Sequence, residues 1–137
     1  MRDDQPDFDM AKIGFIGASG LMGHGMAKNL LAKGHGVALT VHRNRERVAD
    51  LLAAGAVQRT TPAELARTSE IVFLCVTGSP QVEASVTGKD GLLAGAQPGL
   101  VIVDCSTSEP DSTARLRAAS AEVGACLLYT SDAADEL

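Results

Sequence analysis

The chain has 137 residues and a net charge of −5 at neutral pH, with 45% hydrophobic and 21% charged residues. This length and composition predict one globular domain. The negative charge gives no electrostatic reason to expect nucleic acid or an anionic membrane as a partner, and 3% aromatic residues argue against base stacking. No apolar run is long enough to span a membrane, and the acidic first residues are unlike a signal peptide.

Alternating apolar runs and helical patterns make up most of the chain after residues 1–10, which are expected to form a disordered extension. Four short apolar runs predict buried strands of a parallel sheet, at 13–16, 37–41, 71–76 and 100–104. Helical patterns lie between and after them, at 21–33, 45–54, from 62, 79–86 and 108–124. This order predicts an α/β fold with a doubly wound parallel sheet.

Several local signals refine these helices. Met22, Met26 and Leu30 recur at helical spacing and are expected to face inward, and Gly34 is expected to end that helix. In the second helix the inward residues are expected to be Val48, Leu51 and Leu52, with Gly55 as the stop. Thr61-Pro62-Ala63-Glu64 predicts a capping box, and 88–99 is expected to be a loop.

A glycine-rich turn joins the first predicted strand to the first helix, with the sequence Gly17-Ala18-Ser19-Gly20-Leu21-Met22-Gly23. Glycines at such a turn let the backbone bend sharply and approach a pyrophosphate, which the free N–H groups of the helix then bind. The spacing G-x-x-G-x-x-G is one residue longer than the common G-x-G-x-x-G. A merely tight turn is the alternative, but the strand-to-helix context favours a dinucleotide site.

The residues after the second predicted strand indicate which dinucleotide is bound. An acidic residue there usually binds the ribose hydroxyls of NAD, whereas this chain has His42-Arg43-Asn44-Arg45. Arginine suits the 2′-phosphate of NADP, so NADP is favoured over NAD. The alternative is that Arg43, Arg45 and Arg47 form a solvated helix start, although cations there oppose the helix dipole.

These motifs resemble the β-hydroxyacid dehydrogenases, a family that includes 3-hydroxyisobutyrate dehydrogenase and 6-phosphogluconate dehydrogenase. The resemblance runs from about residue 11 to 125. It rests on three segments, which are Lys12 to Leu31 with its G-x-M-G-x-x-M-A-x-N-L pattern, Gly88-Lys89-Asp90-Gly91-Leu92-Leu93, and Asp104-Cys105-Ser106-Thr107-Ser108-Glu109-Pro110. It implies a Rossmann domain and reversible hydride transfer between NAD(P) and a small 3-hydroxy acid.

The resemblance also assigns roles to individual residues. The residues that would hold the cofactor are Gly17, Ala18, Ser19, Gly20, Leu21, Met22, Gly23, Arg43, Asn44, Arg45, Val76, Thr77, Gln81 and Thr107. Val76 and Thr77 stand in place of the family's usual Leu-Pro, and Gln81 in place of an Asn. Ser106 would bind the substrate, although Ser106-Thr107 read without the resemblance predicts a helix cap.

The family's general acid and base is a lysine that is expected beyond the end of this chain, before an all-helical domain. No residue present is therefore assigned as catalytic, and the chain by itself is expected to be inactive. His24, His35 and His42 are scattered and are expected to face solvent or begin helices. The full-length protein is expected to be a homo-oligomer.

The last residues, 126–137, depart from the family pattern. Cys126 to Glu136 resembles an in-frame translation of a sequencing-library adapter, so a non-native tail is expected after an NADP-binding domain at 11–125. Leu127-Leu128-Tyr129 could still form a strand, because apolar residues and Tyr suit a pleated surface.

A non-catalytic module that binds or senses NADP remains the alternative function. A P-loop phosphotransferase is disfavoured because no Gly-Lys-Ser/Thr follows the glycine turn.

The cysteines indicate the cellular setting. Cys75, Cys105 and Cys126 are odd in number and far apart in the sequence, and they match neither a disulfide framework nor a metal motif. A reducing, cytoplasmic location and no bound metal are therefore expected.

Overall fold

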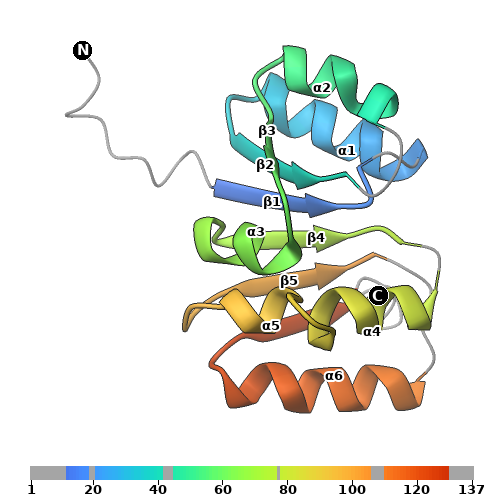
Figure 1. Ribbon diagram of the computed structural model, residues 1–137, viewed down its shortest axis with the longest axis vertical. Helices are drawn as coiled ribbons and strands as arrows, with labels where there is room; N and C mark the ends of the chain where they lie inside the picture. The colour runs from blue at the N-terminus through green and yellow to red at the C-terminus, as the bar shows by residue number, and fades with distance from the viewer. Residues whose placement is uncertain (1–11, 19–20, 42–44, 77, 106–109, 130–137) are drawn as a thin grey trace, which may run out of the picture.

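A six-stranded parallel sheet in the order β3-β2-β1-β4-β5-β6 forms the centre of the computed structural model, which describes residues 12–18, 21–41, 45–76, 78–105 and 110–129. The strands are β1 (Lys12–Ile16), β2 (Gly36–Thr40), β3 (Val57–Arg59), β4 (Ile71–Leu74), β5 (Val101–Asp104) and β6 (Cys126–Tyr129). The chain leaves β1 in one direction for β2 and β3, then returns to the other side of β1 for β4 (Figure 1). This is the predicted doubly wound α/β fold.

Helices cover the sheet in two groups (Figure 1). The helical elements are α1 (Leu21–Ala32), the 3₁₀ helix η2 (Arg45–Val48), α2 (Ala49–Ala53), α3 (Pro62–Thr68), α4 (Ser79–Thr87), α5 (Leu92–Gly95) and α6 (Pro110–Glu122). One apolar cluster joins Phe15 and Leu39 of the sheet to Leu51 of α2. The other cluster includes Ile16 and Ile102 of the sheet and Leu116 of α6. Phe15 and Ile16, which are neighbours on β1, therefore lie in different cores.

Sequence signals at the helix ends are confirmed. Thr61 Oγ1 accepts a hydrogen bond from the backbone N–H of Glu64 at 3.2 Å, with Pro62 in the first turn of α3, as the capping box predicts. Gly34 and Gly55 follow their helices with φ of 90° and 115°, in the left-handed region that glycine adopts without strain. These turns return the chain to the amino ends of β2 and β3.

Three predictions are wrong in detail, and one strand was missed. Met22 does not face inward, because its side chain is 64% exposed, while Met26 and Leu30 do pack on the core. The segment 88–99 contains the short helix α5, with Leu92 fully buried. The helix expected at 45–54 divides into η2 and α2. The strand β3 was not predicted, since it has three residues and its one apolar side chain, Val57, is 46% exposed.

The strand β6 completes the sheet beside β5. Leu127 pairs in register with Ile102 and is 5% exposed, whereas Leu128 is 47% exposed. The prediction that residues 127–129 form a strand is confirmed. The boundaries at residues 10 and 125 and the non-native origin of the tail remain predictions. Among the described residues, no helix has the length and apolar character needed to cross a membrane.

Candidate functional site at the carboxyl ends of the strands

The turn after β1 is built so closely that glycine is required at two positions. Gly17 has φ +97°, and a Cβ placed on it would lie 2.1 Å from the carbonyl oxygen of Cys75. A Cβ on Gly23, in α1, would lie 2.3 Å from the carbonyl oxygen of Gly17. Ala18 between them is fully buried in the core. The backbone of β1, the turn and α1 therefore touch one another directly, as a dinucleotide cradle requires.

The amino end of α1 begins beside this turn. The helix has 12 residues, no acidic residue in its first turn, and an exposed Met22. Its first N–H groups have no partner within the helix, and the positive end of the helix dipole favours a negatively charged group. The residues present therefore fit the pyrophosphate of NAD(P). Ser19 and Gly20, predicted to join this cradle, lie outside the described residues, as does the side chain of Leu21.

The basic segment after β2 is described from Arg45 onward, so Arg43 and Asn44 lie outside the described residues. The exposed Arg45 begins η2, and its Nε donates to Gln58 Oε1 at 2.9 Å. Gln58 belongs to β3 and thereby orients the Arg45 guanidinium. This role could not be predicted from the sequence, because it depends on a strand that was not predicted.

His24 of α1 is held by α2. Its Nε2 lies 2.9 Å from both carboxylate oxygens of Asp50, and this contact lowers the pKa of Asp50 below its ordinary value. The side chain of His24 is 29% exposed, so the expectation that it faces solvent is wrong in part. Its partner and position indicate a structural tie between two helices.

The backbones that follow β4 and β5 continue side by side past the end of the sheet. The N–H of Cys75 donates to the carbonyl of Ile16 at 2.9 Å, and that of Cys105 donates to the carbonyl of Leu74 at 2.8 Å. Val76 is half-buried beside this edge, and Gln81 is exposed in the first turn of α4. Thr77, Ser106 and Thr107 lie outside the described residues, and their predicted roles stay predictions.

The thiols of Cys75 and Cys105 at this edge are expected to be unreactive at neutral pH. Burial, with the neighbouring Cys105 and Asp104, raises the pKa of Cys75 to about 12, and burial also raises the pKa of Cys105. Cys75 Sγ lies 4.0 Å from Met26 Sδ of α1. Both groups remain thiols at neutral pH, so neither supplies a nucleophile or carries protons there.

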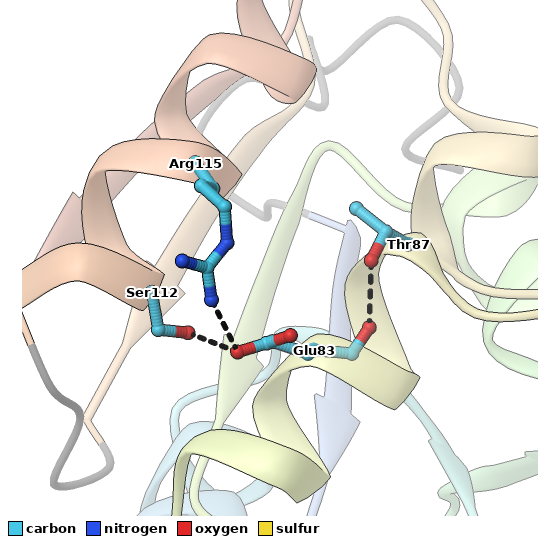
Figure 2. A network of polar contacts seen from close by, with 4 residues as sticks. All are labelled: Glu83, Thr87, Ser112 and Arg115. Atoms are coloured by element: carbon cyan, nitrogen blue, oxygen red, sulfur yellow. Dashed lines mark hydrogen bonds and ion pairs between the residues drawn. The ribbon is translucent and has the colours of Figure 1, made fainter.

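A polar network joins α4 to α6 near the start of α6 (Figure 2). Glu83 Oε2 accepts from Ser112 Oγ at 2.7 Å and from an Arg115 guanidinium nitrogen at 3.2 Å. The hydrogen bond from Ser112 is the main cause that lowers the pKa of Glu83. Glu83 therefore ties the amino end of α6 to the middle of α4. The described part of the chain holds no group of three His, Cys, Asp or Glu side chains that could bind a metal.

The parallel sheet, the reversal of strand order between β1 and β4, and the glycine turn at that point define a dinucleotide-binding domain. The chain belongs to the family of NAD-binding domains of 6-phosphogluconate dehydrogenase, whose model matches residues 12–130. The predicted family is thus confirmed.

The chain is similar in sequence to proteins named as a nuclear factor and to one named as a dehydrogenase-like protein. The cytokine-like nuclear factor N-PAC of Xenopus tropicalis is 41% identical over 105 residues, which are 77% of this chain and 19% of that protein. The mitochondrial 3-hydroxyisobutyrate dehydrogenase-like protein 2 of Arabidopsis thaliana is 37% identical over 99 residues, which are 72% of this chain and 32% of that protein. The chain therefore spans about a fifth to a third of the length of these relatives.

Solved structures share the fold. Psf3, in complex with NADP+ and 2-OPP, is 36% identical with a TM-score of 0.75, over 84% of this chain and 40% of that one. The 3-hydroxyisobutyrate dehydrogenase of Mycobacterium tuberculosis, solved with L-serine, has a TM-score of 0.77 over 88% of this chain and 40% of that one. At 24% identity, the second likeness shows the fold alone.

Proposed function

We propose that the chain is the cofactor-binding domain of an NADP-dependent dehydrogenase or reductase acting on a small β-hydroxy acid. The observation that carries the proposal is the close contact of Gly17, Gly23 and the backbone of Cys75, which sets the amino end of α1 beside the turn, where its N–H groups can bind a pyrophosphate. Bound NADP would supply hydride acceptance, and NADPH would supply hydride donation.

The preference for NADP rests on charge. Arg43 and Arg45 are proposed to bind the 2′-phosphate, with Gln58 holding Arg45 in place through its Nε. The similarity to Psf3, which was solved with NADP+, supports this choice of cofactor. Val76, Thr77, Gln81 and Thr107 are proposed to line the nicotinamide half, and Ser106 is proposed to bind the substrate hydroxyl or carboxylate.

Calorimetry with NADPH and NADH tests this proposal. We expect NADPH to bind about 1–3 kcal/mol more tightly, the range for hydrogen bonds to charged groups. Arg43→Ala should remove most of this preference and Gln58→Ala part of it, while the matched variant Arg47→Ala should keep it. Equal affinities of the unaltered chain for the two cofactors would contradict the NADP assignment.

Turnover requires a proton carrier in addition to the cofactor. The ionisable side chains that end β5 or directly follow β4 and β5 are Asp104, Cys75 and Cys105, and the two thiols stay protonated. We expect the chain by itself not to reduce NADP+ with 3-hydroxyisobutyrate, glycerate or 4-hydroxybutyrate. Turnover that is lost in Ser106→Ala would show that these residues already form a complete active site.

The second candidate is a non-catalytic module that binds or senses NADP. The relatives named as a nuclear factor favour it, since that name describes no dehydrogenase. The two candidates differ in what the gene encodes after codon 125. A lysine-bearing helix there supports the dehydrogenase, and its absence supports the module.

A further inference from the structure

A cavity opens at the amino ends of the first three strands, the edge of the sheet opposite the glycine turn. Its volume is about 470 Å³, and its lining includes Lys12 at the start of β1, Gly36 at the start of β2 and Val57 at the start of β3. The end of α3, at Thr68 and Ser69, closes another side. The cavity extends from this edge to Arg59, the last residue of β3, and its lining includes no residue of the glycine turn or of α1.

Three cations line this cavity although the whole chain is acidic. They are Lys12, Arg59 and Arg67, and no Asp or Glu is among the lining residues. The carboxylate of nearby Glu70 accepts the backbone N–H of Lys12 at 2.9 Å. The carbonyl end of α3 is unfavourable for an anion, but that helix has seven residues and carries Arg67 in its last turn.

Two buried donors on the cavity wall lack partners among the described residues. Arg59 Nε and Ser69 Oγ are both inaccessible to solvent and make no hydrogen bond there. A buried polar group without a partner costs free energy, so such a pair marks a place where a ligand can be bound. An oxyanion can accept from the Nε–H and a terminal N–H of one guanidinium at the same time.

We propose that this cavity, here called the amino-edge pocket, binds a phosphate dianion, either free or as the ester of a small polar molecule. Arg59 would hold two phosphate oxygens through its fork, Ser69 would donate its hydroxyl, and Arg67 and Lys12 would supply the remaining charge. The volume of about 470 Å³ leaves room beyond one phosphate, over the surface of Gly36, Val37 and Ala38. The pocket would act beside the cofactor site and independently of it.

Amide-resolved NMR titration of the ¹⁵N-labelled 137-residue chain tests the proposal at constant low ionic strength. The probes are inorganic phosphate, glycerol 3-phosphate and acetate, each with and without saturating NADP+. We expect both phosphates to shift the amides of Lys12, Gly36 and Ser69, and acetate to shift them far less. Stronger binding of glycerol 3-phosphate than of inorganic phosphate would identify an ester as the ligand, and the reverse order would identify the free ion.

Variants assign the effect to named side chains. Arg59→Gln should weaken phosphate binding about tenfold or more, as expected for losing a paired charged contact, and Arg67→Gln should weaken it less. Lys89→Gln removes the same charge near the amino end of α3, where the carbonyl of Asp90 accepts from Ala63, and should leave binding unchanged. The spectra themselves report whether each variant folds.

The proposal is overturned if phosphate shifts no amide at this edge, or if Lys89→Gln weakens binding as much as Arg59→Gln. These outcomes are separate from the fate of the proposed function. Failure of NADP+ to bind would appear as unshifted amides at Gly17 and Gly23 and would leave the phosphate titration of the amino-edge pocket intact.

Discussion

In the half of the sheet that contains β1 to β3, close backbone contacts shape the carboxyl edge, and one of them reaches Cys75 after β4. In the half that contains β4 to β6, side-chain contacts join α4 to α6. In the first half, Gly17 and Gly23 bring carbonyl groups to within 2.1 and 2.3 Å of where a Cβ would stand. In the second half, Glu83 fixes α6 to α4 through the buried Ser112 and the exposed Arg115 (Figure 2). A methyl group added at Gly17 or Gly23 should therefore disrupt the first half, whereas loss of the Glu83 carboxylate should weaken the second.

This difference has a physical cause. A pyrophosphate is bound mainly by backbone N–H groups, so the chain must approach it without side chains in between. The segments after β4 and β5 instead carry the side chains that would meet the nicotinamide and substrate. The helices α4 and α6 that follow these segments are joined to each other by polar side-chain contacts.

The largest effect is expected from Gly17→Ala and Gly23→Ala. Each added methyl meets backbone atoms, and at Gly17 it also strains a positive φ, so we expect a loss of about 3 kcal/mol or more in the free energy of unfolding. Gly25→Ala is the matched control on α1, where a Cβ meets nothing within 4 Å, and it should be neutral or stabilising. Urea unfolding measures all three. Similar stabilities for Gly23→Ala and Gly25→Ala would refute the close-contact explanation.

Thiol reactivity gives the next largest contrast. A pKa of about 12 leaves Cys75 almost wholly protonated at pH 8. Cys75 and Cys105 are both half-buried and the pKa of Cys105 is also raised, whereas Cys126 is exposed. We expect iodoacetamide to modify Cys126 at least about 100-fold faster than Cys75 in the folded chain. Peptide mass spectrometry over time measures both rates. The two rates should become similar in the denatured chain, which is the control. Equal rates in the native protein would contradict the half-buried placement of Cys75.

A smaller effect is expected from Glu83→Gln in the second half. The folded pKa of Glu83 lies below its ordinary value of 4.5, so its contribution to stability is present above that pH and is lost as the pH falls through the folded pKa. At pH 7 the variant should melt a few degrees lower, and this difference should disappear in acid. The exposed Glu122→Gln on α6 should melt like the unaltered chain. A difference in melting temperature that persists at low pH would point to lost packing instead of lost charge.

Much of the fold could be predicted from the sequence, because its determinants are local. The apolar runs of β1, β4 and β5 and the capping box at Thr61 are continuous signals. The strand β3 escaped prediction because its pairing with β2 depends on the fold as a whole, and its Val57 is exposed. The 3₁₀ turn η2 and the helix α5 are too short for a periodic pattern.

The site was predictable where glycine carries the information and unpredictable where distant residues meet. Gly17 and Gly23 stand out in the sequence as part of a glycine-rich motif, and their close backbone contacts explain why glycine is needed at both positions. The pair of Arg45 and Gln58 joins η2 to an unpredicted strand, and Glu83 meets Ser112 across 29 residues. The amino-edge pocket is lined by Lys12, Arg59 and Arg67 from three different elements, so no sequence spacing could predict it.

The most direct test of the account is the location of bound NADPH on the folded chain. Amide shifts should gather at the carboxyl edge, at Gly17, Ala18, Gly23 and Val76, and should be small at Lys12, Gly36 and Ser69 on the opposite edge. Shifts confined to that opposite edge would mean that NADPH binds only through its phosphates in the amino-edge pocket, and would contradict the proposed cofactor cradle.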